Sequence, residues 1–74
     1  MYVRIISEKV VEITENGDVI TFVEGYCDSE AREEDKLPVK NICGGSNFIE
    51  TDTGNWLFYD ETAGEYNIML SIQE

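Results

Sequence analysis

Hydrophobic and polar residues alternate along much of this chain, and the alternation predicts β-strands. Residues 2–14 are rich in Val and Ile and alternate imperfectly, as strand segments do. Further strands are predicted at 47–51, 55–59 and 65–72, and the last of these alternates cleanly. The pattern predicts an all-β fold, a small antiparallel meander or sandwich-like sheet of about five or six strands with one acidic loop.

The dipeptide Asn16-Gly17 separates the first two apolar runs. Asn-Gly is a strong hairpin signal, because both residues accept positive φ angles in a two-residue turn. Such a turn would place Ile13 opposite Ile20 and would give the hairpin one wholly apolar face. We therefore expect a half-buried hairpin whose second strand ends near residue 24.

Residues 28–36 change character, with five acids, two bases and no large apolar side chain. We interpret them as a mobile, solvated acidic loop. One helical turn capped by Asp28 or Ser29 is the structured alternative, and a calcium loop is disfavoured because the ligand spacing does not match. Residues 37–43 then predict a semi-extended return segment, and the two glycines at 44–45 predict a turn.

The triplet Asp52-Thr53-Gly54 matches the active-site sequence of aspartic proteases. Those enzymes need two carboxylates that share a proton, and they place the triplet after a buried apolar run. Here a glutamate and a threonine precede it and Asn-Trp follows it. We therefore interpret Asp52, Thr53 and Gly54 as a bulged three-residue hairpin turn, in which Gly supplies the positive φ.

Composition narrows the function classes. The 74 residues form at most one small domain, spanning 1–74, with 16 acidic and five basic side chains and a formal charge of −11. Binding of nucleic acids or of anionic membranes depends on Lys and Arg, so both are disfavoured. We interpret the charge as a source of solubility. The more specific alternative is that the acidic surface binds a partner with a basic groove. The first residues show no secretion signal, so we expect the chain in the cytoplasm of the cell that makes it.

Catalytic and metal chemistry find little support in the residue types. The chain has no histidine, so the usual nucleophile–base pairs cannot form. It also has no C-x-x-C pair, which disfavours a zinc site. Cys27 and Cys43 are expected to be reduced thiols. We predict a protein that is not an enzyme and that takes no metal and no cofactor.

Five of the eight aromatic residues fall between positions 44 and 66. Alternation puts aromatic or aliphatic side chains on both faces of the 55–59 strand, and so small a chain cannot cover both faces of a single layer. Such a chain also gains from self-association, because its own core is small. We predict a homodimer or homotrimer, with an interface drawn from Trp56, Phe58, Tyr59, Phe48 and Tyr66.

A longer pattern runs Gly45-Ser46-x-Phe48-x-x-x-Asp52-Thr53-Gly54-x-x-x-x-x-Asp60-Glu61 and closes at Tyr66. It resembles small uncharacterised proteins of bacteriophages and prophages of Gram-positive bacteria. Related hairpins also recur in phage tail-fibre proteins and other virion proteins. The resemblance covers residues 37–68. That family usually has Trp where Tyr66 stands here and Tyr where Leu57 stands, and it brings no catalytic residues.

The resemblance implies a phage setting. Together with the aromatic excess, it favours a non-enzymatic phage structural or accessory protein that acts through protein contacts and self-association. The alternative is a small acidic phage inhibitor that mimics nucleic acid and occupies a host defence or DNA-handling protein. The expected partners are the protein itself and a virion or host protein, in the host cytoplasm or in the virion, with no direct contact to nucleic acid or membrane.

Overall fold

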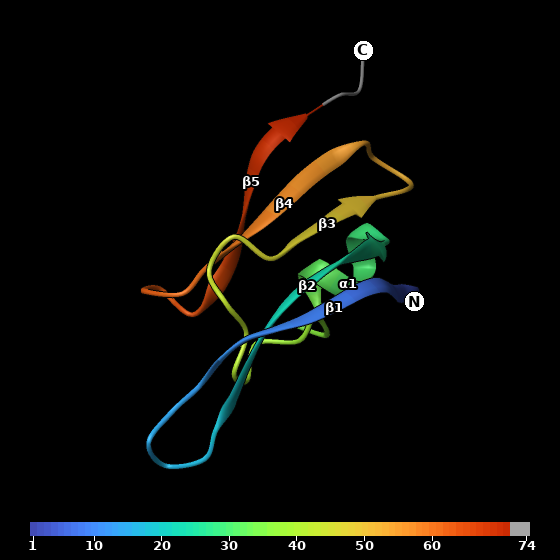
Figure 1. Ribbon diagram of the computed structural model, residues 1–74. Coiled ribbons are helices and arrows are strands. Elements are labelled where there is room, and N and C mark those ends of the chain that lie inside the picture. The colour runs from blue at the N-terminus through green and yellow to red at the C-terminus, as the bar shows by residue number, and fades with distance from the viewer. Residues whose placement is uncertain (72–74) are drawn as a thin grey trace.

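The computed structural model describes residues 1–71 and shows one five-stranded sheet with a short helix against it (Figure 1). This confirms the predicted all-β fold. The elements are β1 (Val3–Ile13), β2 (Val19–Cys27), α1 (Ser29–Glu33), β3 (Asn47–Glu50), β4 (Asn55–Asp60) and β5 (Glu65–Ser71). The last three strands lie close to their predicted bounds, and position 72, which the prediction included, lies outside the described residues.

The strands follow one another across the sheet in the order β1-β2-β3-β4-β5, but β2 and β3 run parallel. The predicted meander is therefore wrong at this one step, and the sheet is a mixed, single layer. Parallel neighbours need a crossover connection, which residues 28–46 provide. The crossover carries α1 and the return segment over one face of the sheet, here called the helix face, and leaves the opposite face open.

The first hairpin forms where predicted, but with a different turn. Gly17 has φ 88° and its amide donates to the carbonyl of Thr14, while the amide of Thr14 donates to the carbonyl of Asp18. Asn16 does not have positive φ. The loop therefore has three residues, in the form of a type I turn followed by a glycine bulge. Ile13 consequently pairs with Val19 instead of Ile20.

Strand β1 is an exposed edge, and the predicted half-buried hairpin is wrong in this respect. None of its eleven residues is buried, and the far end of the β1–β2 hairpin extends away from the rest of the molecule (Figure 1). The pairing with β2 shifts register twice, between Ile5 and Ser7 and between Val10 and Glu12. Such bulges, together with charged side chains, are common devices that keep an edge strand from pairing with other chains.

The acidic segment is not a solvated loop. Asp28 caps α1 by accepting a hydrogen bond from the amide of Ala31 at 2.9 Å, as the structured alternative required. Ala31 is fully buried and belongs to the core. A single small apolar residue therefore anchors this segment. The prediction of a solvated loop rested on the charged residues and gave this alanine no weight.

The core lies between the helix face and the crossover. Its members come from β2, α1, the return segment, β3 and β4, and they are Val23, Cys27, Ala31, Leu37, Ile42, Phe48, Leu57 and Tyr59. The return segment is less extended than predicted, because it bends at Leu37 and turns at residues 40–41, where Asn41 has φ 58°. The backbone of residues 41–43 pairs with Thr21 of β2. The hydroxyls of Tyr59 and Tyr66 donate to the carbonyls of Val39 and Pro38, which holds the segment against the sheet.

Candidate interaction surface

The open face of the sheet carries a row of partly exposed aromatic and aliphatic side chains. The register fixes which residues share it, because directly opposite residues in a ladder point to the same side. Phe22 of β2 alternates with the buried Val23, and Trp56 and Phe58 of β4 alternate with the buried Leu57 and Tyr59. The large members of this surface, which we call the open aromatic face, are Phe22, Tyr26, Ile49, Trp56 and Phe58.

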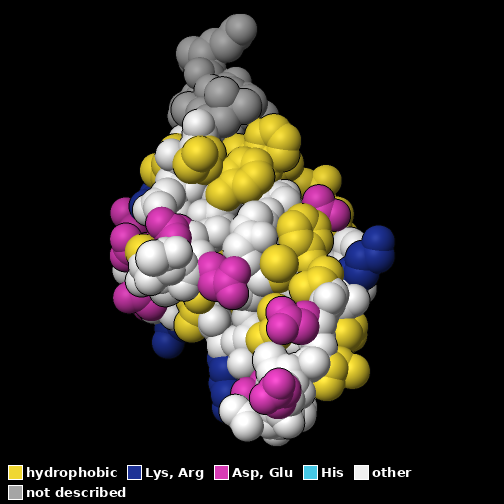
Figure 2. Space-filling model, turned by 60° about the vertical axis from the view of Figure 1, so that its left-hand side comes forward, with side chains coloured by type: hydrophobic (Ala, Val, Ile, Leu, Met, Phe, Trp, Pro, Cys, Tyr) yellow, Lys and Arg dark blue, Asp and Glu magenta, His cyan; other side chains and the backbone are white. Residues whose placement is uncertain are grey.

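Trp56 lies next to Phe58, with ring centroids 5.3 Å apart and planes tilted by 37°. Its indole Nε1 donates to the side-chain oxygen of Asn47 on β3 at 3.3 Å, which fixes the ring orientation. Both aromatic rings are only partly buried. In the space-filling view, hydrophobic side chains gather in patches with acidic groups between them (Figure 2). A fixed, half-exposed Trp-Phe pair is a favourable anchor for a protein contact.

The structure separates the five aromatic residues that the sequence grouped as an interface. Trp56 and Phe58 lie on the open aromatic face, as alternation predicted. Phe48 and Tyr59 are core residues on the helix face and cannot take part in a surface contact in this fold. Tyr66 also lies on the helix face, where its ring packs edge-on against Phe48 and against Tyr59. Phe48 and Tyr59 belong to the monomer core because α1 and the return segment cover them, whereas Tyr66 is half-buried at the border of this cover.

The sequence reasoning missed three members of the open aromatic face, namely Phe22, Tyr26 and Ile49. Their grouping depends on β2 and β3 being neighbours, with Gly25 paired to Phe48 and Tyr26 paired to Ile49. The sequence showed which residues of each strand point to the same face. It did not show the parallel pairing between the two strands, so the residues of β2 could not be placed beside those of β4.

Charges are sparse at the centre of the open aromatic face. Glu24 is the charged residue among its β2 positions, and the facing positions of β3 are Asn47 and Ile49. On the β1 side, Arg4 pairs with Tyr26 and Lys9 pairs with Phe22, so two of the five basic residues border this face. The same register places Glu12, Asp60 and Glu65 on this side towards its ends, so the low density of acidic groups is confined to the centre of the face.

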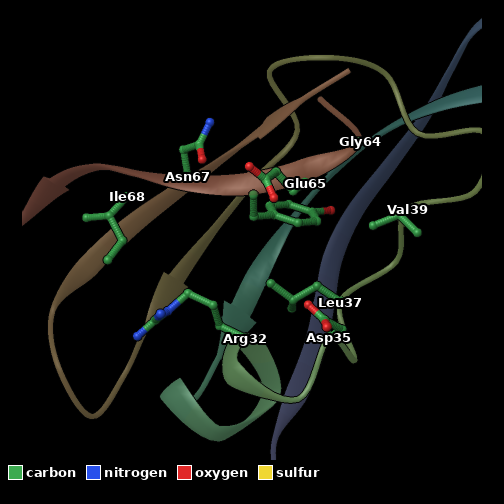
Figure 3. A pocket seen from close by; sticks show the side chains of 9 residues that line it. Arg32, Asp35, Leu37, Val39, Gly64, Glu65, Asn67 and Ile68 are labelled. Atoms are coloured by element: carbon green, nitrogen blue, oxygen red, sulfur yellow. The ribbon is translucent and has the colours of Figure 1, made fainter. Parts of the chain in front are cut away.

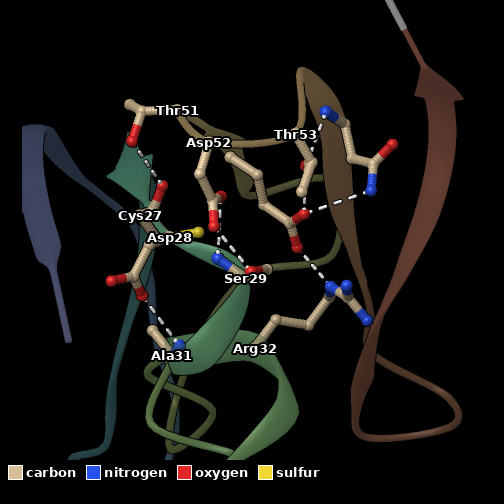
Figure 4. A network of polar contacts seen from close by, with 10 residues as sticks. Cys27, Asp28, Ser29, Ala31, Arg32, Thr51, Asp52 and Thr53 are labelled. Carbon is tan, nitrogen blue, oxygen red and sulfur yellow. Dashed lines mark hydrogen bonds and ion pairs between the residues drawn. The ribbon is translucent and has the colours of Figure 1, made fainter. Parts of the chain in front are cut away.

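A buried carboxylate on the helix face joins α1 to the β3–β4 loop (Figure 4). Glu50 is fully buried and accepts hydrogen bonds from Arg32 Nε, from the Thr53 hydroxyl and from Asn55 Nδ2. The hydrogen bond to Glu50 raises the pKa of Arg32 above its ordinary value. The Glu50 carboxylate is hydrogen-bonded and closed to solvent, so its geometry indicates a structural role.

The D-T-G triplet forms a turn, as predicted, although the loop spans four residues, 51–54, instead of three. Gly54 has φ 78° and its amide donates to the carbonyl of Glu50. The carboxylate of Asp52 accepts hydrogen bonds from the amide and the hydroxyl of Ser29, at 3.0 and 2.6 Å (Figure 4). The Ser29 hydroxyl is the main cause that lowers the pKa of Asp52. An aspartate engaged in this way ties the turn to α1.

The two cysteines differ in environment. Cys27 is buried, and burial followed by the nearby Glu50 raises its thiol pKa from 9.0 to about 12. A thiol with such a pKa is unreactive at neutral pH. Cys43 is half-buried, and within residues 1–71 both are free thiols. Among the same residues, no three His, Cys, Asp or Glu side chains lie close enough to hold a metal ion.

Comparisons with protein-family models, with curated proteins and with solved structures found no match for this chain. In the described part of the chain, no helix has the length and apolar character needed to cross a membrane.

Proposed function

We propose that this protein is a non-enzymatic phage structural or accessory protein that works through protein contacts, with the open aromatic face as its contact surface. The observation that carries the proposal is the half-exposed pair Trp56 and Phe58, on a sheet face that no element of residues 1–71 covers. The phage setting is supported by the sequence resemblance over residues 37–68.

The first partner proposed for this face is a second copy of the chain. Two copies with a net charge of −11 each repel one another. The open aromatic face carries little of that charge at its centre and is bordered by Arg4 and Lys9, so it is the part of the surface where two copies approach at the lowest electrostatic cost. Face-to-face packing of two sheets about 10 Å apart would bury the aromatic row as in a β-sandwich.

Light scattering on purified protein at about 0.05 M and about 0.5 M NaCl tests this assembly. We expect a homodimer that becomes tighter at high salt, because salt screens the repulsion between protomers. Trp56→Ala should weaken the dimer about 30-fold, which corresponds to the roughly 2 kcal/mol typical of a Trp anchor. Tyr2→Ala is a suitable control, since it truncates an exposed aromatic residue outside the sheet.

Circular dichroism on each variant separates assembly from folding. A wild-type protein that stays monomeric at high micromolar concentration in both salts contradicts the self-association proposal. A Trp56→Ala variant that unfolds would show that Trp56 stabilises the monomer instead, and Phe58→Ala would then serve as the second interface variant. A trimer in place of a dimer would retain the surface and change only the symmetry.

The second candidate function is an acidic inhibitor that occupies a basic groove of a host defence or DNA-handling protein. The observation that favours it is that α1 fixes Glu30 and Glu33 as exposed acids on an ordered helix, with Glu34 directly after it. Mass spectrometry of purified virions distinguishes the two functions. Presence in the particle supports the structural role, whereas absence from it, together with capture of a host nuclease, supports the inhibitor.

A further inference from the structure

The two edges of the sheet differ in how they are protected. Strand β1 has two bulges and carries Arg4, Glu8, Lys9 and Glu12. Strand β5 ends the strand order on the other side, and residues 66–71 are uncharged in a chain that is 28% charged. Among the described residues, no strand lies beyond β5. The pairing of β5 with β4 shifts register once, between Trp56 and Leu57. Residues 66–68, which precede that shift along β5, carry no charge and no proline, so they offer their backbone groups to another strand.

A pocket of about 660 Å³ lies beside β5, between this strand and the segment that follows α1 (Figure 3). Five consecutive residues of the chain, 64–68, line it. Neighbouring residues of a strand point to opposite faces, so residues of both orientations border the pocket. The pocket therefore lies along the outer edge of β5 as well as against the helix face. Its apolar wall consists of Leu37, Val39, Tyr66 and Ile68, of which Val39 and Ile68 are about half exposed.

The charges around the pocket leave it acidic. Arg32 lines it, but its charge is matched by the fully buried Glu50. Asp35 and Glu65 also line the pocket and are exposed. Neither of them forms a salt bridge within residues 1–71. The carboxylates at this edge therefore complement a positively charged ligand.

We propose that the outer edge of β5 and this pocket form a binding site for an extended peptide segment whose every second residue is basic or apolar, so that both kinds of side chain lie on one face. Such a segment adds to the sheet as a sixth strand, and its backbone hydrogen-bonds to β5. Alternate side chains then point to the helix face. There an apolar side chain contacts Leu37 and Ile68, and a Lys or Arg pairs with Asp35. Glu65 lies opposite Asp60 in the ladder and so has the other orientation, and it attracts the basic side chains from the start of β5.

Charge selects this occupant over a second copy of the chain. A second β5 strand would bring another Glu65 and Asp35 to the same edge, and the two protomers carry −11 each. A basic peptide meets opposite charge at the pocket and is also attracted by the whole molecule. The site is separate from Trp56 and Phe58, because its apolar wall, which includes Tyr66 and Ile68, lies on the helix face.

The test uses a fluorescein-labelled peptide of sequence TKTLTKT and fluorescence anisotropy at about 0.15 M NaCl. The protein variant is Asp35→Asn combined with Glu65→Gln, and asparagine at position 35 keeps a residue that tolerates the observed φ of 55°. The matched control is Glu33→Gln combined with Glu34→Gln, which removes the same charge from exposed positions that do not line the pocket. The second probe is the same peptide N-methylated at alternate residues, which keeps its charge and loses backbone donors.

We expect the Asp35/Glu65 variant to bind the peptide about fivefold more weakly and the control variant less than about twofold more weakly. The N-methylated peptide should bind about tenfold more weakly, because a strand at the edge depends on its backbone donors. Amide NMR shifts should change at residues 64–69. Equal weakening in both double variants, equal binding of the N-methylated peptide, or no binding of TKTLTKT to the wild type overturns the proposal.

Discussion

Replacement of Arg32 by methionine should destabilise the fold because it leaves the Glu50 carboxylate buried without its cation. Loss of one partner from a fully buried ion pair costs about 3–5 kcal/mol. Two observations reduce that figure here. The Arg32 side chain is 28% exposed, and the Thr53 hydroxyl and the Asn55 amide still donate to Glu50. We therefore expect a loss of about 2–3 kcal/mol.

That loss is large for this chain. A domain of this size has a free energy of unfolding of about 4–11 kcal/mol at roughly 0.05–0.15 kcal/mol per residue. The melting temperature should fall by about 10–20 °C. Urea unfolding followed by Trp56 fluorescence and by circular dichroism measures the change. Lys36→Met, which removes an exposed cation close to α1, is the control and should stay within about 0.5 kcal/mol of the wild type.

A double-mutant cycle isolates the pair from other effects of the substitution. Glu50→Leu alone removes the buried charge, and Arg32→Met with Glu50→Leu replaces the pair by apolar groups. Because such replacement is often tolerated, the double variant should be more stable than the sum of the single changes predicts, by about 1.5 kcal/mol or more. Additivity within about 0.5 kcal/mol would refute the reasoning, since it would show that Arg32 and Glu50 do not stabilise one another.

Two further predictions concern the crossover and the core. Replacement of residues 28–36 by a Gly/Ser loop of equal length should abolish cooperative unfolding, because it removes the buried Ala31 and the Arg32–Glu50 pair; a retained sigmoidal urea transition would contradict this. Stability should fall as pH rises from about 9 towards 12, because the Cys27 thiol has its pKa raised from 9.0 to about 12 by burial, so the unfolded chain releases this proton first. Urea midpoints at several pH values measure the decline, and a Cys27→Ala variant that declines as steeply would contradict the assignment to Cys27.

The sequence predicted the local features of this fold well. The alternation over 47–51, 55–59 and 65–72 located β3, β4 and β5 to within a residue among the described positions. The glycines at 17 and 54 marked both turns, because positive φ is a local requirement that few other residues meet. In each turn the loop is one residue longer than predicted. The alternation separated Trp56 and Phe58 correctly from Leu57 and Tyr59.

Interactions between distant segments were not predictable in this way. The parallel pairing of Glu24 with Asn47 depends on the crossover, and no residue near either position signals it. The acidic run at 28–36 was interpreted as solvated because its charges outnumber one alanine, yet that alanine and the arginine beside it make the contacts that fix α1. A loop one residue longer at Gly17 changed the register of the whole first hairpin, since strand faces alternate with a period of two.

The parallel seam between β2 and β3 bears on how fast the chain reaches its native state. The other strand pairs are joined by short loops, whereas Glu24 and Asn47 lie 23 positions apart. Hairpins form in about 1–10 μs, but a seam closed by a long connection forms only after its loop entropy has been overcome. Substitutions along the seam, such as at Phe48, should therefore slow folding. Substitutions near the tip of the β1–β2 hairpin should mainly accelerate unfolding.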